Sequence, residues 1–116
     1  MCEHCFNEQI ESFQSSKEWE KFDLILSQKL GRGDLTYVNQ VTLNYGGMGY
    51  AVFHCSHCSQ NWCLSDPDHA WRGFFLIEEK AHNFLRSLNK RDGYMKWGVW
   101  ALILTAILLA LMLYLN

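Results

Sequence analysis

The sequence of 116 residues contains a single proline, Pro67, and no charged residue between Trp97 and Leu115. Its first twelve residues, MCEHCFNEQIES, are polar and acidic, so they lack the apolar core of a secretory signal peptide. Residues 1–79 carry eleven acidic and only five basic side chains, a net charge of −6. A groove for nucleic acid needs clustered lysine and arginine, so this balance argues against nucleic-acid binding.

Common active-site motifs are absent as well. The sequence has no GxSxG, no HExxH and no P-loop lysine motif. The glycine-rich stretch NYGGMGY does not match GxGxxG and lies between two strand-like runs, so it predicts a turn. We therefore expect a protein that is not an enzyme.

The uncharged run from Trp97 to Leu115, WGVWALILTAILLALMLYL, is the longest apolar segment. As a helix rising 1.5 Å per residue it is about 28 Å long, close to the ~30 Å hydrocarbon core of a bilayer. The run predicts one transmembrane helix over residues 97–115, which anchors the chain in a membrane by its C-terminal end.

A basic neck over residues 78–96 precedes this span. Lys90, Arg91 and Lys96 lie just before the apolar run, and no basic residue follows it. The positive-inside rule therefore places the N-terminal head in the cytoplasm, and we expect a single-pass protein of the bacterial inner membrane. The same three side chains suit anionic lipid headgroups, although they are equally explained as determinants of topology alone.

The head, residues 1–77, is small for an unaided hydrophobic core, and such domains often need a metal ion or disulfides. Ser15-Ser16-Lys17-Glu18 has the pattern of a capping box. It opens a predicted helix over residues 16–30, whose apolar face is formed at helical spacing by Trp19, Phe22, Leu26 and Leu30. We expect Gly31 to end this helix.

Four further runs predict strands: LTYVNQVTLNY, YAVFHC, NWCLS and part of HAWRGFFLI. The run EEKAHNFLRSLNK has helical spacing, and Asp92-Gly93 predicts a break before the membrane span. The predicted fold class is therefore α+β: a small antiparallel sheet with an inserted helix, a juxtamembrane helix and one C-terminal transmembrane helix.

Two CxxC motifs stand 49 residues apart, Cys2-Glu3-His4-Cys5 and Cys55-Ser56-His57-Cys58. Two such pairs supply the four thiolates of a tetrahedral structural Zn²⁺ site. Iron, as a cluster or a single ion, also accepts four cysteines and stays open as an alternative. Disulfides are disfavoured in the reducing cytoplasm. The fifth cysteine, Cys63, lies beside Trp62 in a predicted strand, and we expect it to have a packing role.

Each CxxC motif has the form of a zinc knuckle, a tight turn that presents two cysteines to one ion, and the second lies on the hairpin YAVFHCSHCSQNWCLS. With these two knuckles the sequence resembles the zinc-ribbon family over about residues 1–6 and 35–77. The resemblance implies a small antiparallel sheet and a structural zinc ion held by Cys2, Cys5, Cys55 and Cys58. Knuckles of that family commonly have glycine after the second cysteine, where this chain has Phe6 and Ser59. The run HCSHCSQNWCLSDPDHAWRGFF also looks like small bacterial proteins, some of them immunity partners of secreted toxins.

An aromatic group with one arginine follows the second knuckle. Aromatic residues and arginine are favoured as anchors of protein interfaces, but they equally form the core of a small domain. The candidates for partner contact are Trp62, Trp71, Arg72, Phe74 and Phe75.

The sequence is consistent with three functions. The first is a membrane-anchored module that binds a basic or membrane-embedded protein, with an immunity-type inhibitor of a toxin as its specific form. The second is a structural subunit or assembly factor of a membrane complex. The third is a sensor that responds to metal or redox state.

Overall fold

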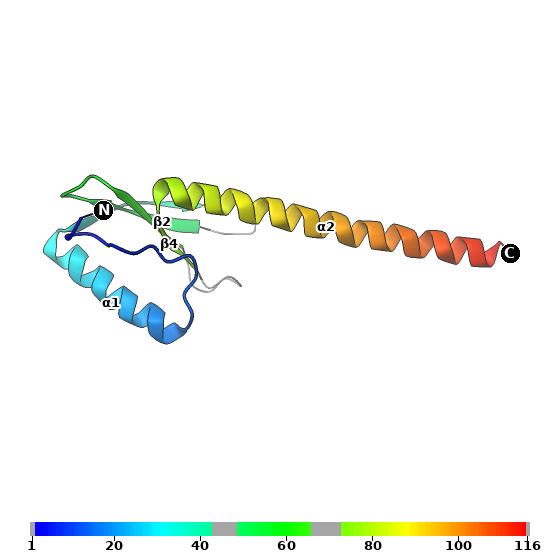
Figure 1. Ribbon diagram of the computed structural model, residues 1–116, viewed down its shortest axis with the longest axis horizontal. Coiled ribbons are helices and arrows are strands. Elements are labelled where there is room, and N and C mark those ends of the chain that lie inside the picture. Colours follow the sequence, from blue (N-terminus) through cyan, green and yellow to red (C-terminus); the bar gives the residue numbers. More distant parts are fainter. Residues whose placement is uncertain (1, 43–48, 66–72, 116) are drawn as a thin grey trace. The chain divides into compact units, whose positions relative to one another are not determined.

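The structure is a computed structural model that describes residues 2–42, 49–65 and 73–115. The chain divides into two compact units, residues 1–82 and 83–116. The fold is α+β, as predicted (Figure 1). Its elements in chain order are α1 (Ser16–Arg32), β1 (Leu35–Thr42), β2 (Gly49–Cys55), β3 (Asn61–Ser65), β4 (Phe75–Ile77) and α2 (Glu78–Tyr114).

Helix α1 begins at the predicted capping signal. Ser15 is the N-cap, and its hydroxyl accepts a hydrogen bond from the backbone N–H of Glu18 at 3.2 Å. The Glu18 carboxylate in turn accepts from the backbone N–H of Gln14 at 2.6 Å. The helix continues through Gly31 and ends at Gly33, whose φ of 79° lies in the left-handed region. The predicted end at Gly31 is therefore wrong by two residues, because it is Gly33 that adopts the backbone conformation of a C-cap.

The four strands form one antiparallel sheet in the order β1-β2-β3-β4. The N-terminal segment covers the β4 edge, because Ile10 and Phe75 exchange two backbone hydrogen bonds of 2.8 and 2.7 Å. At the opposite edge, the register of β1 shifts between Tyr37 and Asn39, which indicates a β-bulge. The predicted hairpin of residues 35–55 is confirmed in its strands, whereas its turn lies outside the described residues.

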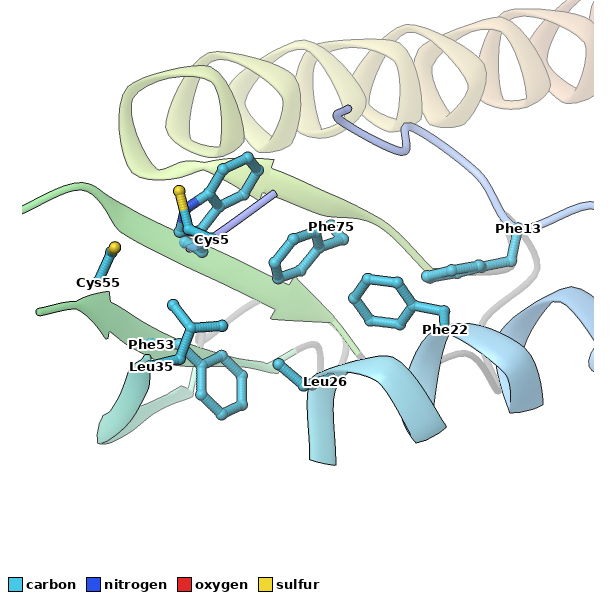
Figure 2. Packing of buried hydrophobic residues seen from close by; sticks show 9 residues of the cluster. Cys5, Phe13, Phe22, Leu26, Leu35, Phe53, Cys55 and Phe75 are labelled. Atoms are coloured by element: carbon cyan, nitrogen blue, oxygen red, sulfur yellow. The ribbon is translucent and has the colours of Figure 1, made fainter. Parts of the chain in front are cut away.

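An aromatic core lies between α1, the N-terminal segment and one face of the sheet (Figure 2). Phe75 is at its centre: its ring stacks on Trp62 with centroids 4.8 Å apart and planes at 4°, and it contacts Phe6 and Phe22 at 4.7 Å. Phe22 and Leu26 supply the buried face of α1, as the helical spacing predicts. Since Cys5 and Cys55 belong to the same buried cluster, the core is continuous with the cysteines.

The other face of the sheet is also buried. Side chains alternate along a strand, so residues adjacent in sequence to those of the aromatic core point to this second face. These residues are Val52, Cys63 and Leu76, and all three are buried. Tyr50 lies there too, and its hydroxyl is 3.1 Å from Nε2 of His82 in the second turn of α2. This contact ties β2 to the beginning of the last helix.

Helix α2 is continuous over 37 residues. The break predicted at Asp92-Gly93 is therefore wrong. A single glycine in a helix interior costs only about 1 kcal/mol, and no proline lies nearby to remove a backbone donor. Among the residues that the structure describes, one helix, residues 78–115, is long and apolar enough to cross a membrane, with a mean hydropathy of 2.4 in its most apolar window.

Candidate metal centre

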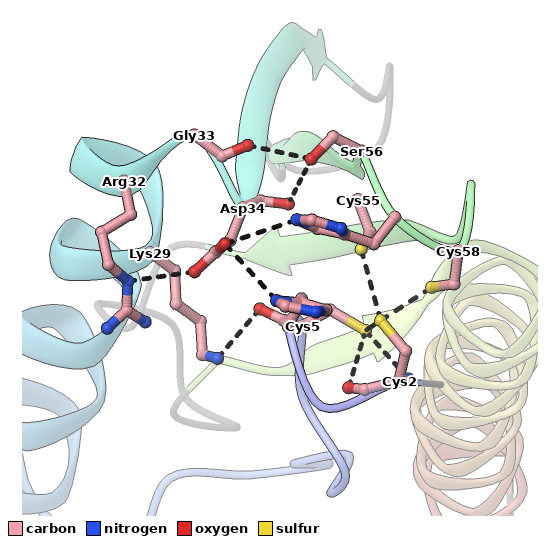
Figure 3. Close-up of polar contacts among 11 residues, drawn as sticks. Cys2, Cys5, Lys29, Arg32, Gly33, Asp34, Cys55, Ser56 and Cys58 are labelled. Atoms are coloured by element: carbon pink, nitrogen blue, oxygen red, sulfur yellow. Dashed lines mark hydrogen bonds and ion pairs between the residues drawn. The ribbon is translucent and has the colours of Figure 1, made fainter.

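Two tight turns that are far apart in the sequence carry the four cysteines. In the first, the backbone N–H of Cys5 donates to the carbonyl oxygen of Cys2 at 3.3 Å. In the second, the backbone N–H of Ser59 donates to the carbonyl of Cys55, the last residue of β2, at 3.0 Å. Each turn presents its two cysteines to the same small volume, which Figure 3 shows.

The sulfur atoms of these cysteines have the spacing of metal ligands. Cys2 Sγ lies 3.6 Å from Cys5 Sγ and 3.7 Å from Cys55 Sγ, and Cys5 Sγ lies 3.7 Å from Cys58 Sγ. All four lie within 4.8 Å of one another. Four sulfurs placed about 2.3 Å from a central Zn²⁺ in a tetrahedron would be about 3.8 Å apart. The four cysteines predicted as ligands therefore lie close enough together to hold a metal ion.

At these distances the cysteines form no disulfide in this structure. A disulfide requires sulfur atoms about 2.05 Å apart, and all five cysteines of the chain are free. The site is partly closed to solvent, because Cys5 and Cys55 are buried whereas Cys58 is exposed. This arrangement is typical of a thiolate centre at the edge of a core.

The cysteines do not ionise alike. Desolvation raises the pKa of Cys2, but hydrogen bonds from the backbone of Cys5 and His4 and from neighbouring thiols outweigh it and lower the pKa to about 6. Desolvation and the hydrogen bonds of the neighbouring thiols together raise the pKa of Cys58 to about 12, although a hydrogen bond from the backbone of Gln60 opposes them. A cation among these sulfurs would relieve the repulsion that keeps the second and later thiols protonated.

The turn of the second knuckle contains a strained residue. Ser59 has a φ of 59°. Among the described residues, it is the only one other than glycine that has a positive φ. This is the position where zinc ribbons commonly have glycine. Ser59 thus adopts the left-handed conformation without being glycine, at a cost of about 1–2 kcal/mol.

The C-terminal end of α1 is bound to both knuckles (Figure 3). Lys29 Nζ donates to the carbonyl oxygen of His4 in the first knuckle at 3.0 Å and lies 5.3 Å from the Phe6 ring centroid. In the second knuckle, the Ser56 hydroxyl donates to the carbonyls of Gly33 at 2.9 Å and Asp34 at 3.2 Å. The inserted helix therefore contacts the turns of both CxxC motifs.

Asp34 and two histidines form a second cluster beside the cysteines. The rings of His4 and His57 stack with centroids 3.7 Å apart, and a nitrogen of each faces Asp34 Oδ1 at 3.8 and 3.5 Å. Partial burial raises the pKa of Asp34, but the hydrogen bond and charge of Arg32 and the two histidines lower it overall. Sequence reasoning placed both histidines at variable turn positions and missed their pairing. The available signal was the repeated pattern C-x-H-C, with histidine directly before the second cysteine of each motif.

The other predicted site residues lie elsewhere. Cys63 is completely buried, which confirms its packing role. Trp62, Phe74 and Phe75 are completely buried as well, so the prediction that they form a partner surface is wrong and their alternative role as core holds. Trp62 and Phe75 are covered by α1 and the N-terminal segment, whereas Phe74 packs against Tyr50. Trp71 and Arg72 lie outside the described residues.

The basic neck residues Lys90, Arg91 and Lys96 are all exposed on α2. They precede the apolar stretch of the helix, and the large apolar side chains from Trp97 to Leu115 are exposed too. The helix thus has charged side chains followed by an apolar surface that is exposed among the described residues.

No protein-family model matches the chain, and neither a curated protein nor a solved structure is significantly similar to it. The function is therefore inferred from the geometry of the site and from the chemistry of its residues.

Proposed function

We propose that the protein is a non-catalytic binding module, anchored in a membrane by α2, whose head is held together by a structural Zn²⁺ ion. The observation that carries the proposal is the spacing of the four cysteine sulfur atoms. Neighbouring sulfur atoms lie 3.6–3.7 Å apart, and they come from two CxxC motifs that are far apart in the sequence. The residues fit the ion in number, type and spacing. Cys2, Cys5, Cys55 and Cys58 would hold Zn²⁺, which supplies cross-linking of the fold rather than chemistry.

Four thiolates support a structural role because they leave no open coordination position. A catalytic zinc ion usually has three protein ligands and keeps the fourth position for water or substrate. Here the ligands complete the tetrahedron, and Cys5 and Cys55 are buried in the core that the ion would cross-link. Loss of the ion would therefore loosen the packing of the whole head.

The C-terminal helix supports the membrane anchor. Its apolar residues are exposed, and a bilayer is the environment that would cover such a helix at the lowest cost. Lys90, Arg91 and Lys96 on the N-terminal side favour a cytoplasmic head. We further propose a bacterial inner membrane, which rests on the resemblance of the HCSHCSQNWCLSDPDHAWRGFF run to small bacterial proteins.

Exposed apolar side chains on the head support a protein partner. Trp62, Phe74 and Phe75 are buried, so we look for contacts among the exposed side chains of the described head. Among the described residues of the head, the large apolar side chains that are exposed are Leu24 and Ile25 on α1 and Tyr37 and Val38 on β1. Asp23 lies beside the first pair, in a head of net negative charge. A partner with a basic and apolar surface would be complementary to these residues.

The proposal is tested by photo-crosslinking in intact cells from a reactive residue at Ile25. We expect a specific adduct in the membrane fraction and about one Zn²⁺ per purified chain. Leu24→Asp should abolish the adduct by adding a charge beside the apolar contact. The matched control Asn89→Asp adds the same charge on α2 and should leave the adduct intact. A soluble, metal-free protein, or an adduct unaffected by Leu24→Asp, would contradict the proposal.

A further inference from the structure

The side chains of His4, Asp34 and His57 meet on the outer side of the knuckles. His4 comes from the first knuckle, His57 from the second, and Asp34 from the residue that follows the C-cap of α1. One ligand atom from each lies within 4.8 Å of the others. Three metal-binding side chains from three separate segments thus converge, although none of them belongs to the four-cysteine centre.

The spacing of these atoms differs from that of ordinary hydrogen bonds. The imidazole nitrogens lie 3.8 and 3.5 Å from Asp34 Oδ1, and hydrogen bonds of this type measure 2.7–3.2 Å. Ligands bonded at about 2.0–2.2 Å to one tetrahedral ion are separated by about 3.3–3.6 Å. The cluster is therefore slightly wider than a loaded site. Because the two rings stack nearly in parallel, with centroids 3.7 Å apart, at least one ring would have to turn out of the stack for both nitrogens to point at one ion.

The second oxygen of Asp34 is already engaged. Arg32 Nε donates to Asp34 Oδ2 at 3.0 Å, which holds the carboxylate so that Oδ1 faces the two rings. A partner of this kind on a carboxylate is typical of metal ligands. The knuckles themselves fix the positions of His4 and His57, because each histidine directly precedes a cysteine of the first centre.

We propose that His4, Asp34 and His57 form a second, exchangeable site for a divalent transition-metal ion. Two imidazoles and one carboxylate suit Zn²⁺, Co²⁺, Ni²⁺ or Cu²⁺. The His4 and His57 side chains are 55% and 44% exposed, so water or an external ligand can complete the coordination. The site would thus respond to the supply of free metal, in contrast to the closed thiolate centre. The inference rests on the proposed thiolate centre, which holds the two knuckles in place.

The test is a Co²⁺ titration of the full-length protein in detergent, after one equivalent of Zn²⁺ has filled the thiolate centre. We expect a second equivalent to bind and to give the weak absorption of a nitrogen and oxygen site, without sulfur-to-metal charge-transfer bands. His57→Ala and Asp34→Asn should each weaken this second equivalent by more than about tenfold while the Zn²⁺ is retained. His54→Ala is the matched control, because the His54 ring lies 2.8 Å from Asn61 Oδ1 and outside the cluster.

The outcomes separate the two metal proposals. Saturation at one equivalent, or a second equivalent that His57→Ala binds as tightly as the wild type, would overturn the second site and leave the thiolate centre standing. Failure to bind any metal would overturn both. The retained Zn²⁺ shows that each variant is folded, and His57→Gln, which keeps the size of the side chain, gives an independent check.

Discussion

The sulfur atoms of Cys2 and Cys55 lie 3.7 Å apart although 53 positions separate them in the sequence. A contact of this kind closes a long loop, and closing it costs conformational entropy that the ordered head must recover. A metal ion bound by both residues would supply that free energy, since ion binding to a site that exists only in the folded chain stabilises the fold. The following predictions start from this relationship.

Replacing a buried ligand should unfold the head. In Cys55→Ser a weaker ligand replaces a thiolate at a completely buried position, so we expect loss of Zn²⁺ and of protease resistance. Cys63→Ala is the matched control: Cys63 is equally buried but lies outside the cluster, so the variant should keep its Zn²⁺ and lose about 1–2 kcal/mol of stability. Metal analysis and limited proteolysis measure both. A Cys55→Ser protein as stable as the wild type would contradict the account.

Removing the strain at Ser59 should stabilise the protein. Its φ of 59° is accessible to glycine without steric cost, so Ser59→Gly should raise the free energy of unfolding of the metal-loaded head by about 1 kcal/mol.

The opposite change, from glycine to a residue with a side chain, can be tested at Gly33. Gly33 has a φ of 79°, and no atom lies within 4 Å of an added Cβ. Gly33→Ala should therefore destabilise the head by about 1 kcal/mol through backbone strain alone. Denaturant unfolding of both variants gives the comparison. Equal stability of Ser59→Gly and the wild type would show that the turn is unstrained.

Much of the head could be predicted from local pattern. The capping box at Ser15 and the spacing of Phe22 and Leu26 predicted α1, and alternation predicted the strands, because these signals act over a few residues. The four cysteines were predictable for the same reason, as two motifs of fixed internal spacing.

The remaining features depend on tertiary contacts. Whether Trp62 and Phe75 were core or surface could not be decided from the sequence, because both roles favour aromatic residues. Their stacking depends on the pairing of β3 with β4. Asp34 had no signal of its own, since its role arises only where the end of α1 meets both knuckles.

Cys63 should be chemically inert and should make the head sensitive to alkali. Desolvation, and then the charge of Glu78, raises the pKa of Cys63 to about 12. A raised pKa means that the folded state favours the neutral thiol. The stabilisation is therefore complete below the ordinary thiol pKa, near 9, and is lost as the pH rises toward 12.

Alkylation followed by mass spectrometry at neutral pH should leave Cys63 unmodified in the native protein. Chelation of the metal should make the other four cysteines reactive first. Deprotonation of Cys63 should contribute to the loss of stability of the wild type at alkaline pH. The Cys63→Ala variant should lack this contribution. Early modification of Cys63 would show that the core around it opens readily.

A charge in the middle of the apolar stretch should impair membrane insertion. Ala106 lies at the centre of residues 97–115, where an arginine costs about 2.5–3.5 kcal/mol. Ala106→Arg should shift the protein from the carbonate-resistant membrane fraction to the soluble or degraded fraction. Tyr94→Arg, placed before the stretch, is the control and should remain in the membrane. Soluble wild-type protein would contradict the anchor.

X-ray absorption at the zinc edge tests the central claim most directly, on full-length protein purified from detergent-solubilised membranes and freed of weakly bound metal by a mild chelator. We predict one zinc ion per chain surrounded by four sulfur atoms at about 2.3 Å. A first shell containing nitrogen or oxygen, a different metal in its place, or cysteines found joined as disulfides would contradict it.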